Sequence, residues 1–260
     1  NAANQYHPLD VYRYFRDVLG IEHIQFIPIV ERDNDTGFQE GDVVTDRSVD
    51  PTAWGEFLAT IFDEWVGRDV GKVFVQMFDS ALASWLDLPS SMCLFRETCG
   101  DALALEHNGD LYACDHLVEP GYHRGNILET PLSRMVASPD QRRFGLDKRD
   151  TLPTYCRTCD VRFACHGECP RNRFLKTPAG EEGLNYLCAG YKLFFHHIDR
   201  PMRIMVDLLR RRRAPAGELH LEPFAGEVHQ SAAGPLGRAP EFGIGDGVDA
   251  LPDGVVGRAF

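Results

Sequence analysis

Two segments near the start of the chain place apolar residues at helical spacing. Residues 7–20 contain one apolar face at this spacing, and Gly20 supplies a stop signal; the face consists of Val11, Tyr12, Phe15, Val18 and Leu19. Residues 51–66 repeat the pattern with a row of large apolar side chains, behind Asp50 as a suitable N-cap. The pattern therefore predicts two amphipathic helices.

Between and after these helices the pattern changes to short, nearly continuous apolar runs. Residues 21–30 and 72–78 are rich in β-branched and aromatic side chains, which is typical of strands buried on both faces of a parallel sheet. A short helix is predicted over 79–86. Residues 1–88 therefore indicate an α/β unit. Two strands do not form a stable parallel sheet alone, so we expect this unit to be the end of a larger α/β domain.

Beyond residue 88 the spacing becomes irregular. Segments 102–107 and 111–114 flank Asn108-Gly109-Asp110, a strong hairpin signal. Residues 131–136 are predicted to form a helical turn, and 151–185 is rich in turn residues.

The C-terminal part divides into a helix and a low-complexity tail. Residues 189–213 return to helical spacing, and we expect a break near Pro201. Beyond residue 213 the chain is rich in Gly, Pro and Ala without periodicity, so 214–260 is predicted to be a disordered tail.

Composition and charge exclude some partners. The 260 residues carry a formal charge of −12, which disfavours nucleic acid and anionic membranes. No run of 18 apolar residues is present, so the sequence predicts no transmembrane helix.

The cysteines carry the candidate chemistry. All eight lie in one window of the chain: Cys93, Cys99, Cys114, Cys156, Cys159, Cys165, Cys169 and Cys188. Eight thiols are two sets of four, the number that ligates one structural zinc ion or one iron–sulfur cubane. A disulfide framework belongs to short secreted chains and fits this one poorly. Both metal alternatives imply a reducing compartment, and we expect the cytoplasm.

Cysteine spacing favours iron–sulfur over zinc. Zinc sites usually combine two C-x2-C pairs, whereas only Cys156 and Cys159 form such a pair. The gaps of five and three residues that lead to Cys165 and Cys169 fit cubanes better.

The full cysteine pattern resembles a known domain. It runs Cys93-x5-Cys99-x14-Cys114, then the dense run from Cys156 to Cys169, then Cys188, with Gly109 five residues before Cys114. This spacing resembles the SPASM domain, a twin-cluster extension of many radical-SAM enzymes.

Three further segments resemble the anaerobic sulfatase-maturating enzymes of that superfamily: Gln25-Phe-Ile-Pro28, the apolar run 73–78, and Cys114-Asp115. The resemblance implies an α/β fold in which 1–88 is the C-terminal part of a radical-SAM (β/α) barrel. An irregular α+β SPASM domain over 89–213 and the tail would follow. It also implies oxidation of a cysteine or serine of a sulfatase to Cα-formylglycine with S-adenosylmethionine (SAM).

The resemblance divides the thiols between two auxiliary [4Fe–4S] clusters out of sequence order. The first would be held by Cys93, Cys99, Cys114 and Cys169, and the second by Cys156, Cys159, Cys165 and Cys188.

The resemblance also assigns two non-cysteine residues. Asp115 would be the base that takes a proton from the substrate; from the residues alone it could equally be an exposed turn acid, and His116 is the local alternative base. Gln25 would lie on the strand that approaches SAM. The alternative is that Gln25 is a polar residue whose hydrogen bonds are satisfied inside the barrel.

The SAM-cleaving cluster of such enzymes needs a C-x3-C-x2-C motif. Cys165-x3-Cys169 supplies the first spacing, but position 172 is Asn, and no cysteine precedes Cys93. We therefore expect SAM and a third [4Fe–4S] cluster to be held by the full-length enzyme, and this chain alone to be inactive. The implied partners are an unfolded sulfatase polypeptide and an electron carrier such as flavodoxin or ferredoxin.

Two alternatives stay open. Another SPASM-containing radical-SAM maturase of peptides would share the cysteine pattern. A structural zinc protein acting as an interaction module would also use eight thiols, although the spacings fit it badly.

Overall fold

The computed structural model describes residues 1–216, so the tail predicted over 214–260 lies almost wholly outside the described residues. The first part of the chain alternates helices with short strands: α1 (Pro8–Arg13), η1 (Tyr14–Val18), β1 (His23–Ile24), α2 (Pro51–Arg68), β2 (Phe74–Val75) and α3 (Gln76–Trp85). The second part is built from short elements and one long helix: η2 (Cys93–Phe95), β3 (Ala104–Leu105), β4 (Asp110–Tyr112), η3 (Pro120–Tyr122), β5 (His123–Asn126), α4 (Leu132–Val136), α5 (Pro139–Asp150), α6 (Thr154–Arg157), α7 (Arg162–Cys165), η4 (Pro170–Asn172), β6 (Leu175–Lys176), β7 (Glu182–Leu184) and α8 (Cys188–Arg210).

The two predicted strands pair in parallel, which confirms the α/β reading of the first part. His23 lies opposite Phe74 and Ile24 opposite Val75. The prediction of a strand through residue 78 was wrong, because α3 begins at Gln76. A short apolar run does not by itself separate a strand from a buried helical turn, and Met77 and Phe78 are buried on α3 instead.

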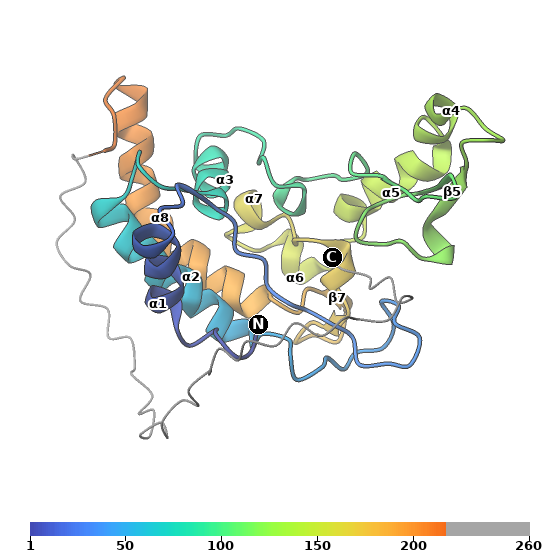
Figure 1. The fold of residues 1–260 in the computed structure, drawn as a ribbon, viewed down its shortest axis with the longest axis horizontal. Helices are drawn as coiled ribbons and strands as arrows, with labels where there is room; N and C mark the ends of the chain where they lie inside the picture. The colour runs from blue at the N-terminus through green and yellow to red at the C-terminus, as the bar shows by residue number, and fades with distance from the viewer. Residues whose placement is uncertain (217–260) are drawn as a thin grey trace, which may run out of the picture. The chain divides into compact units, whose positions relative to one another are not determined.

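Helices α2 and α8 form the centre of the core and lie side by side (Figure 1). The start of α2 follows from its sequence, since the Asp50 carboxylate accepts a hydrogen bond from Ala53 N at 2.9 Å and Pro51 needs no donor. Aromatic rings fill the contact, with Phe78 between Phe62 and Phe194. The core therefore joins the α/β part to the last helix.

Helix α8 runs without interruption from Cys188 to Arg210, so the predicted break near Pro201 was wrong. Proline removes only one helical hydrogen bond. Pro201 and the adjacent Met202 are both buried, and this packing holds the helix together across the missing bond.

The helix predicted over 7–20 is confirmed in part, because α1 ends at Arg13 and continues as the π-helix η1, and only part of its predicted apolar face is buried. Tyr12 is fully buried, whereas Val18 and Leu19 are exposed. Polar contacts anchor the segment instead: Tyr12 Oη donates to Asp69 Oδ2 at 2.8 Å, and Arg16 pairs with Asp69 at 2.7 Å and with Glu64 at 3.0 Å.

The irregular second part contains the predicted hairpin, which is confirmed as the antiparallel pair β3–β4. Strand β5 adds a third antiparallel strand that the pattern did not indicate. The helical turn over 131–136 is confirmed as α4. Helix α5 was not predicted, although Ser138 caps it and Pro139 opens it.

No helix among residues 1–216 is long and apolar enough to cross a membrane.

Candidate metal centres and catalytic site

The structure brings four cysteines together at the start of α8, which we call the second cysteine group: Cys156, Cys159, Cys165 and Cys188. They line one small cavity together with Asn185 and Tyr191. Cys156 comes from α6, Cys165 ends α7, and Cys188 opens α8. Burial raises the pKa of Cys188 to about 11, and the charges of Cys156 and Cys159 add to the effect. This influence agrees with the shared cavity in placing these thiols near one another.

The other four thiols form the first cysteine group: Cys93, Cys99, Cys114 and Cys169. Cys93, Cys99 and Cys114 line one cavity. Burial raises the pKa of Cys114 to about 12, with a smaller contribution from the charge of Cys93. Burial likewise raises the pKa of Cys169, and Cys114 is the one thiol among the causes of that shift. This influence indicates that Cys169 lies near Cys114, and Cys169 is not among the residues that line the cavity of the second group.

Backbone amides point at several of these sulfurs. His116 N donates to Cys114 Sγ at 3.4 Å. Burial raises the pKa values of Cys165 and Cys169. Hydrogen bonds from the backbone amides of Gly167 and Arg171, respectively, lower these pKa values in part. Each amide belongs to the residue two positions after its cysteine. Hydrogen bonds to sulfur are one of the protein's means of tuning iron–sulfur clusters, so the donor set fits such a group.

Helix α5 positions the first cysteine group through one polar face. Gln141 Nε2 donates to Gly100 O at 2.8 Å and to Ala113 O at 3.0 Å, next to Cys99 and Cys114. Gly145 O accepts from Cys99 N at 3.1 Å. Lys148 Nζ donates to Cys93 O at 2.6 Å. Sequence reasoning missed these residues, because a buried face of Gln, Gly and Lys gives no hydrophobic periodicity; the cap and proline at 138–139 were the available signal.

Asp115 lies directly beside the first group. Its Oδ1 accepts a hydrogen bond from Cys114 Sγ at 3.3 Å, and its backbone amide donates to Ala102 O at 2.9 Å. The Asp115 side chain is exposed, as is that of His116. Polar atoms of Cys114, Asp115 and His116 lie within 4.8 Å of one another. An exposed carboxylate is therefore bonded to a thiol that lines the cavity of the first group.

Gln25 lies in a separate cleft of about 420 Å³ that it shares with His23, Gln76 and Asp79. Gln25 and Gln76 stand just beyond the carboxyl ends of β1 and β2, the side where barrel enzymes build their active sites. Gln25 is exposed. Ser91 lines both this cleft and the cavity of the first cysteine group, so the two sites adjoin.

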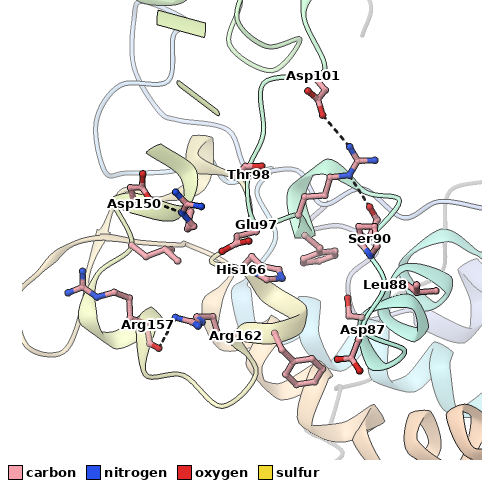
Figure 2. A pocket seen from close by; sticks show the side chains of 17 residues that line it. Asp87, Leu88, Ser90, Glu97, Thr98, Asp101, Asp150, Arg157, Arg162 and His166 are labelled. Atoms are coloured by element: carbon pink, nitrogen blue, oxygen red, sulfur yellow. Dashed lines mark hydrogen bonds and ion pairs between the residues drawn. The ribbon is translucent and has the colours of Figure 1, made fainter. Parts of the chain in front are cut away.

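Figure 2 shows a larger polar pocket, of about 1100 Å³, which the sequence did not indicate. Its walls come from the segments that carry the thiols: Glu97 and Thr98 precede Cys99, Arg157 follows Cys156, and His166 follows Cys165. Four arginines face four carboxylates around it, which leaves the pocket nearly balanced in charge: Arg96, Arg149, Arg157, Arg162, Asp87, Glu97, Asp101 and Asp150.

Comparison with known proteins supports the iron–sulfur reading of this region. Residues 93–160 match the SPASM family, described as an iron-sulfur cluster-binding domain. The serine-type anaerobic sulfatase-maturating enzyme of Bacteroides thetaiotaomicron is 47% identical over 227 residues, which is 83% of this chain and 54% of that enzyme. The cysteine-type enzyme of Clostridium perfringens is 27% identical over 197 residues, which is 74% of this chain and 50% of that enzyme.

The same family is found among solved structures. Native anSMEcpe with bound AdoMet and the Cp18Cys peptide superposes with a TM-score of 0.69 at 25% identity, covering 80% of this chain and 56% of that one. The chain therefore spans about half the length of the relatives it matches. The fold expected from the sequence, part of a radical-SAM barrel followed by a SPASM domain, is confirmed. With its cysteine pattern, its α/β unit and these relatives, the chain belongs to the family of radical-SAM anaerobic sulfatase-maturating enzymes.

Proposed function

We propose that this chain is the substrate-oxidising and electron-transferring part of an enzyme that converts a cysteine or serine of a sulfatase to Cα-formylglycine. The observation that carries the proposal is the exposed carboxylate of Asp115, hydrogen-bonded to a thiol of a four-cysteine group. The relatives that are named as sulfatase-maturating enzymes support the same substrate class.

The two cysteine groups would each hold one auxiliary [4Fe–4S] cluster. Four thiols around a common cavity, several with a backbone amide aimed at the sulfur, suit a cluster whose irons are all protein-bound. When bound, such a cluster supplies a one-electron acceptor. Zinc would occupy the same donors, but it would add no redox chemistry.

Asp115 would act as the base. A thiolate bound to iron has no proton to donate, so the bond from Cys114 Sγ to Asp115 Oδ1 is lost when the metal binds. The carboxylate oxygen is then free to accept the proton of the substrate's thiol or hydroxyl. The hydrogen bond from the Asp115 backbone amide to Ala102 O keeps the residue in place during this change.

The substrate segment would lie across the two adjoining sites. Gln25 and its neighbours at the strand ends are proposed to face SAM, and Ser91 leads from that cleft to the cavity beside Cys114. An unfolded sulfatase segment placed here would present its target residue to both SAM and Asp115.

SAM cleavage itself would need a further cluster held by three cysteines. The two proposed sets of four would use all eight thiols of this chain, which leaves none for it. We infer that this chain alone does not cleave SAM. Electrons from the auxiliary clusters would pass to a carrier such as flavodoxin or ferredoxin, and a reducing compartment, the cytoplasm, would keep the thiols available.

Iron and sulfide analysis tests this proposal. Anaerobically reconstituted chain is expected to be brown, with about eight irons and eight sulfides, and to give no 5′-deoxyadenosine from SAM. The full-length enzyme is expected to convert a sulfatase peptide to its formylglycine form, detected by mass spectrometry. Zinc as the sole metal, or a peptide left unmodified or crosslinked, would contradict the proposal; the last result would indicate another SPASM maturase.

Cysteine variants test how the thiols are divided. Cys169→Ser is expected to remove about half of the iron, since one cubane loses a ligand. The double variant Cys93→Ser/Cys169→Ser should lose little more, because both changes fall in one group. In contrast, Cys165→Ser/Cys169→Ser should lose nearly all iron, although its two positions are close in sequence. Equal iron content in the two double variants would refute the division.

A further inference from the structure

Two basic side chains, one buried and one half-buried, lie beside the cysteine-bearing segments. Lys148 on α5 is 1% exposed, and its Nζ donates to Cys93 O at 2.6 Å and to Leu94 O at 2.8 Å. Arg173 follows η4 and is half-buried. Its Nη1 donates to Lys148 O at 2.6 Å, so the two residues are joined. Together they connect the backbone of Cys93 and Leu94 to the loop that follows Cys165.

Arg173 also holds the loop between the two groups. Residues 166–168 connect Cys165 to Cys169, and the guanidinium donates to all three of their carbonyl oxygens at 2.9–3.0 Å. His166 (φ 47°) and Glu168 (φ 53°) are non-glycine residues in the left-handed region, a conformation that must be held by its surroundings. Figure 2 shows the outer side of this loop, where His166 faces the pocket. The bonds from Arg173 fix the loop from within.

Neither cation has a carboxylate at ion-pair distance within residues 1–216. The buried acid nearby, Glu168, is bound by the amides of Asn172 and Asn185, and its charge acts on both cations from beyond ion-pair distance. Burial lowers the pKa of Lys148, and the charges of Cys99 and Cys169 act against that shift. A buried charge without a paired counter-ion is costly, so an anion is expected at the position of the thiols.

We propose that Lys148 and Arg173 are positioning residues whose buried charges raise the reduction potentials of the clusters held by the first and second cysteine groups, respectively. The inference rests on the clusters of the proposed function. A cubane bound by four thiolates carries net negative charge, and reduction adds one more electron. A cation held nearby in a medium of low dielectric constant stabilises the reduced form more than the oxidised form.

The test is a dithionite titration of the reconstituted protein followed by electron paramagnetic resonance. Lys148→Gln keeps a side chain that can donate to Cys93 O but removes the charge. It is expected to lower the midpoint potential of one cluster and to leave the other nearly unchanged. Arg173→Gln is expected to lower the other potential. Lys176→Gln is the matched control, since it removes an exposed lysine paired with Glu182 at 3.0 Å and should move neither potential.

Each outcome decides between this inference and the proposed function. Absence of iron and sulfide in the parent protein overturns both. Full iron content in Lys148→Gln with both potentials unchanged overturns the role of the charge and leaves the clusters standing. If Lys148→Gln does not retain iron, Lys148→Arg restores the charge and is expected to restore loading. Iron loss in Lys148→Arg as well overturns the inference, because side-chain shape would then be decisive.

Discussion

Asp115→Asn is expected to slow formation of formylglycine by the full-length enzyme about 10²- to 10⁴-fold, the usual contribution of a positioned base. The substitution keeps the size of the side chain and the backbone bond to Ala102, so the loop should stay in place. Cleavage of SAM to 5′-deoxyadenosine should continue, because the role proposed for Asp115 lies in the oxidation of the peptide alone. Both products can be measured in one reaction, by mass spectrometry and by chromatography.

Two neighbouring residues serve as controls. Asp101→Asn removes another exposed acid, one that lines the cavity of the first cysteine group and pairs with Arg96 at 3.4 Å, and it should leave peptide oxidation near the parent rate. His116→Gln tests the alternative base. An undiminished rate in Asp115→Asn together with a large loss in His116→Gln would transfer the role of base to the histidine.

Gly190→Ala is expected to destabilise the protein by about 3 kcal/mol, the upper part of the range for overpacking a core. Helices α2 and α8 are closest at Gly55 and Gly190. A Cβ at position 190 would stand 2.9 Å from Gly55 N and would collide with Pro51 O. All of these are backbone atoms, so the helices themselves must move apart. Urea unfolding followed by tryptophan fluorescence measures the loss, since Trp54 and Trp65 lie on α2.

The same substitution should also affect the second cysteine group. Cys188 opens α8 only two residues before Gly190, so a shift of the helix moves a predicted iron ligand. We therefore expect iron to be lost from the second group before the first. Gly67→Ala on α2 is the matched control, because its Cβ meets nothing within 4 Å. Replacing this helical glycine by alanine should raise the free energy of unfolding by about 0.5–1 kcal/mol. A neutral Gly190→Ala would mean that the helices tolerate a wider separation.

Sequence patterns predicted those elements whose signals are local. The Asp50 cap with Pro51 marked the start of α2, and Asn108-Gly109 marked the hairpin, because caps and tight turns depend on a few adjacent residues. Patterns failed where packing overrode local preference. Pro201 does not break α8, since the helix is buried around it, and Gln76 begins a helix within an apolar run.

The sequence by itself determined the chemistry of this protein: eight thiols at family spacing, an aspartate after Cys114, and an α/β unit before them. Only the tertiary structure decided how these parts meet. It brought Cys156, Cys159, Cys165 and Cys188 around one cavity, and it brought Gln141, Gly145 and Lys148 against the cysteine loops from a helix without an apolar face. The physical reason is that thiols and buried polar groups find partners through contacts distant in sequence, and neither residue spacing nor hydrophobic periodicity records such contacts.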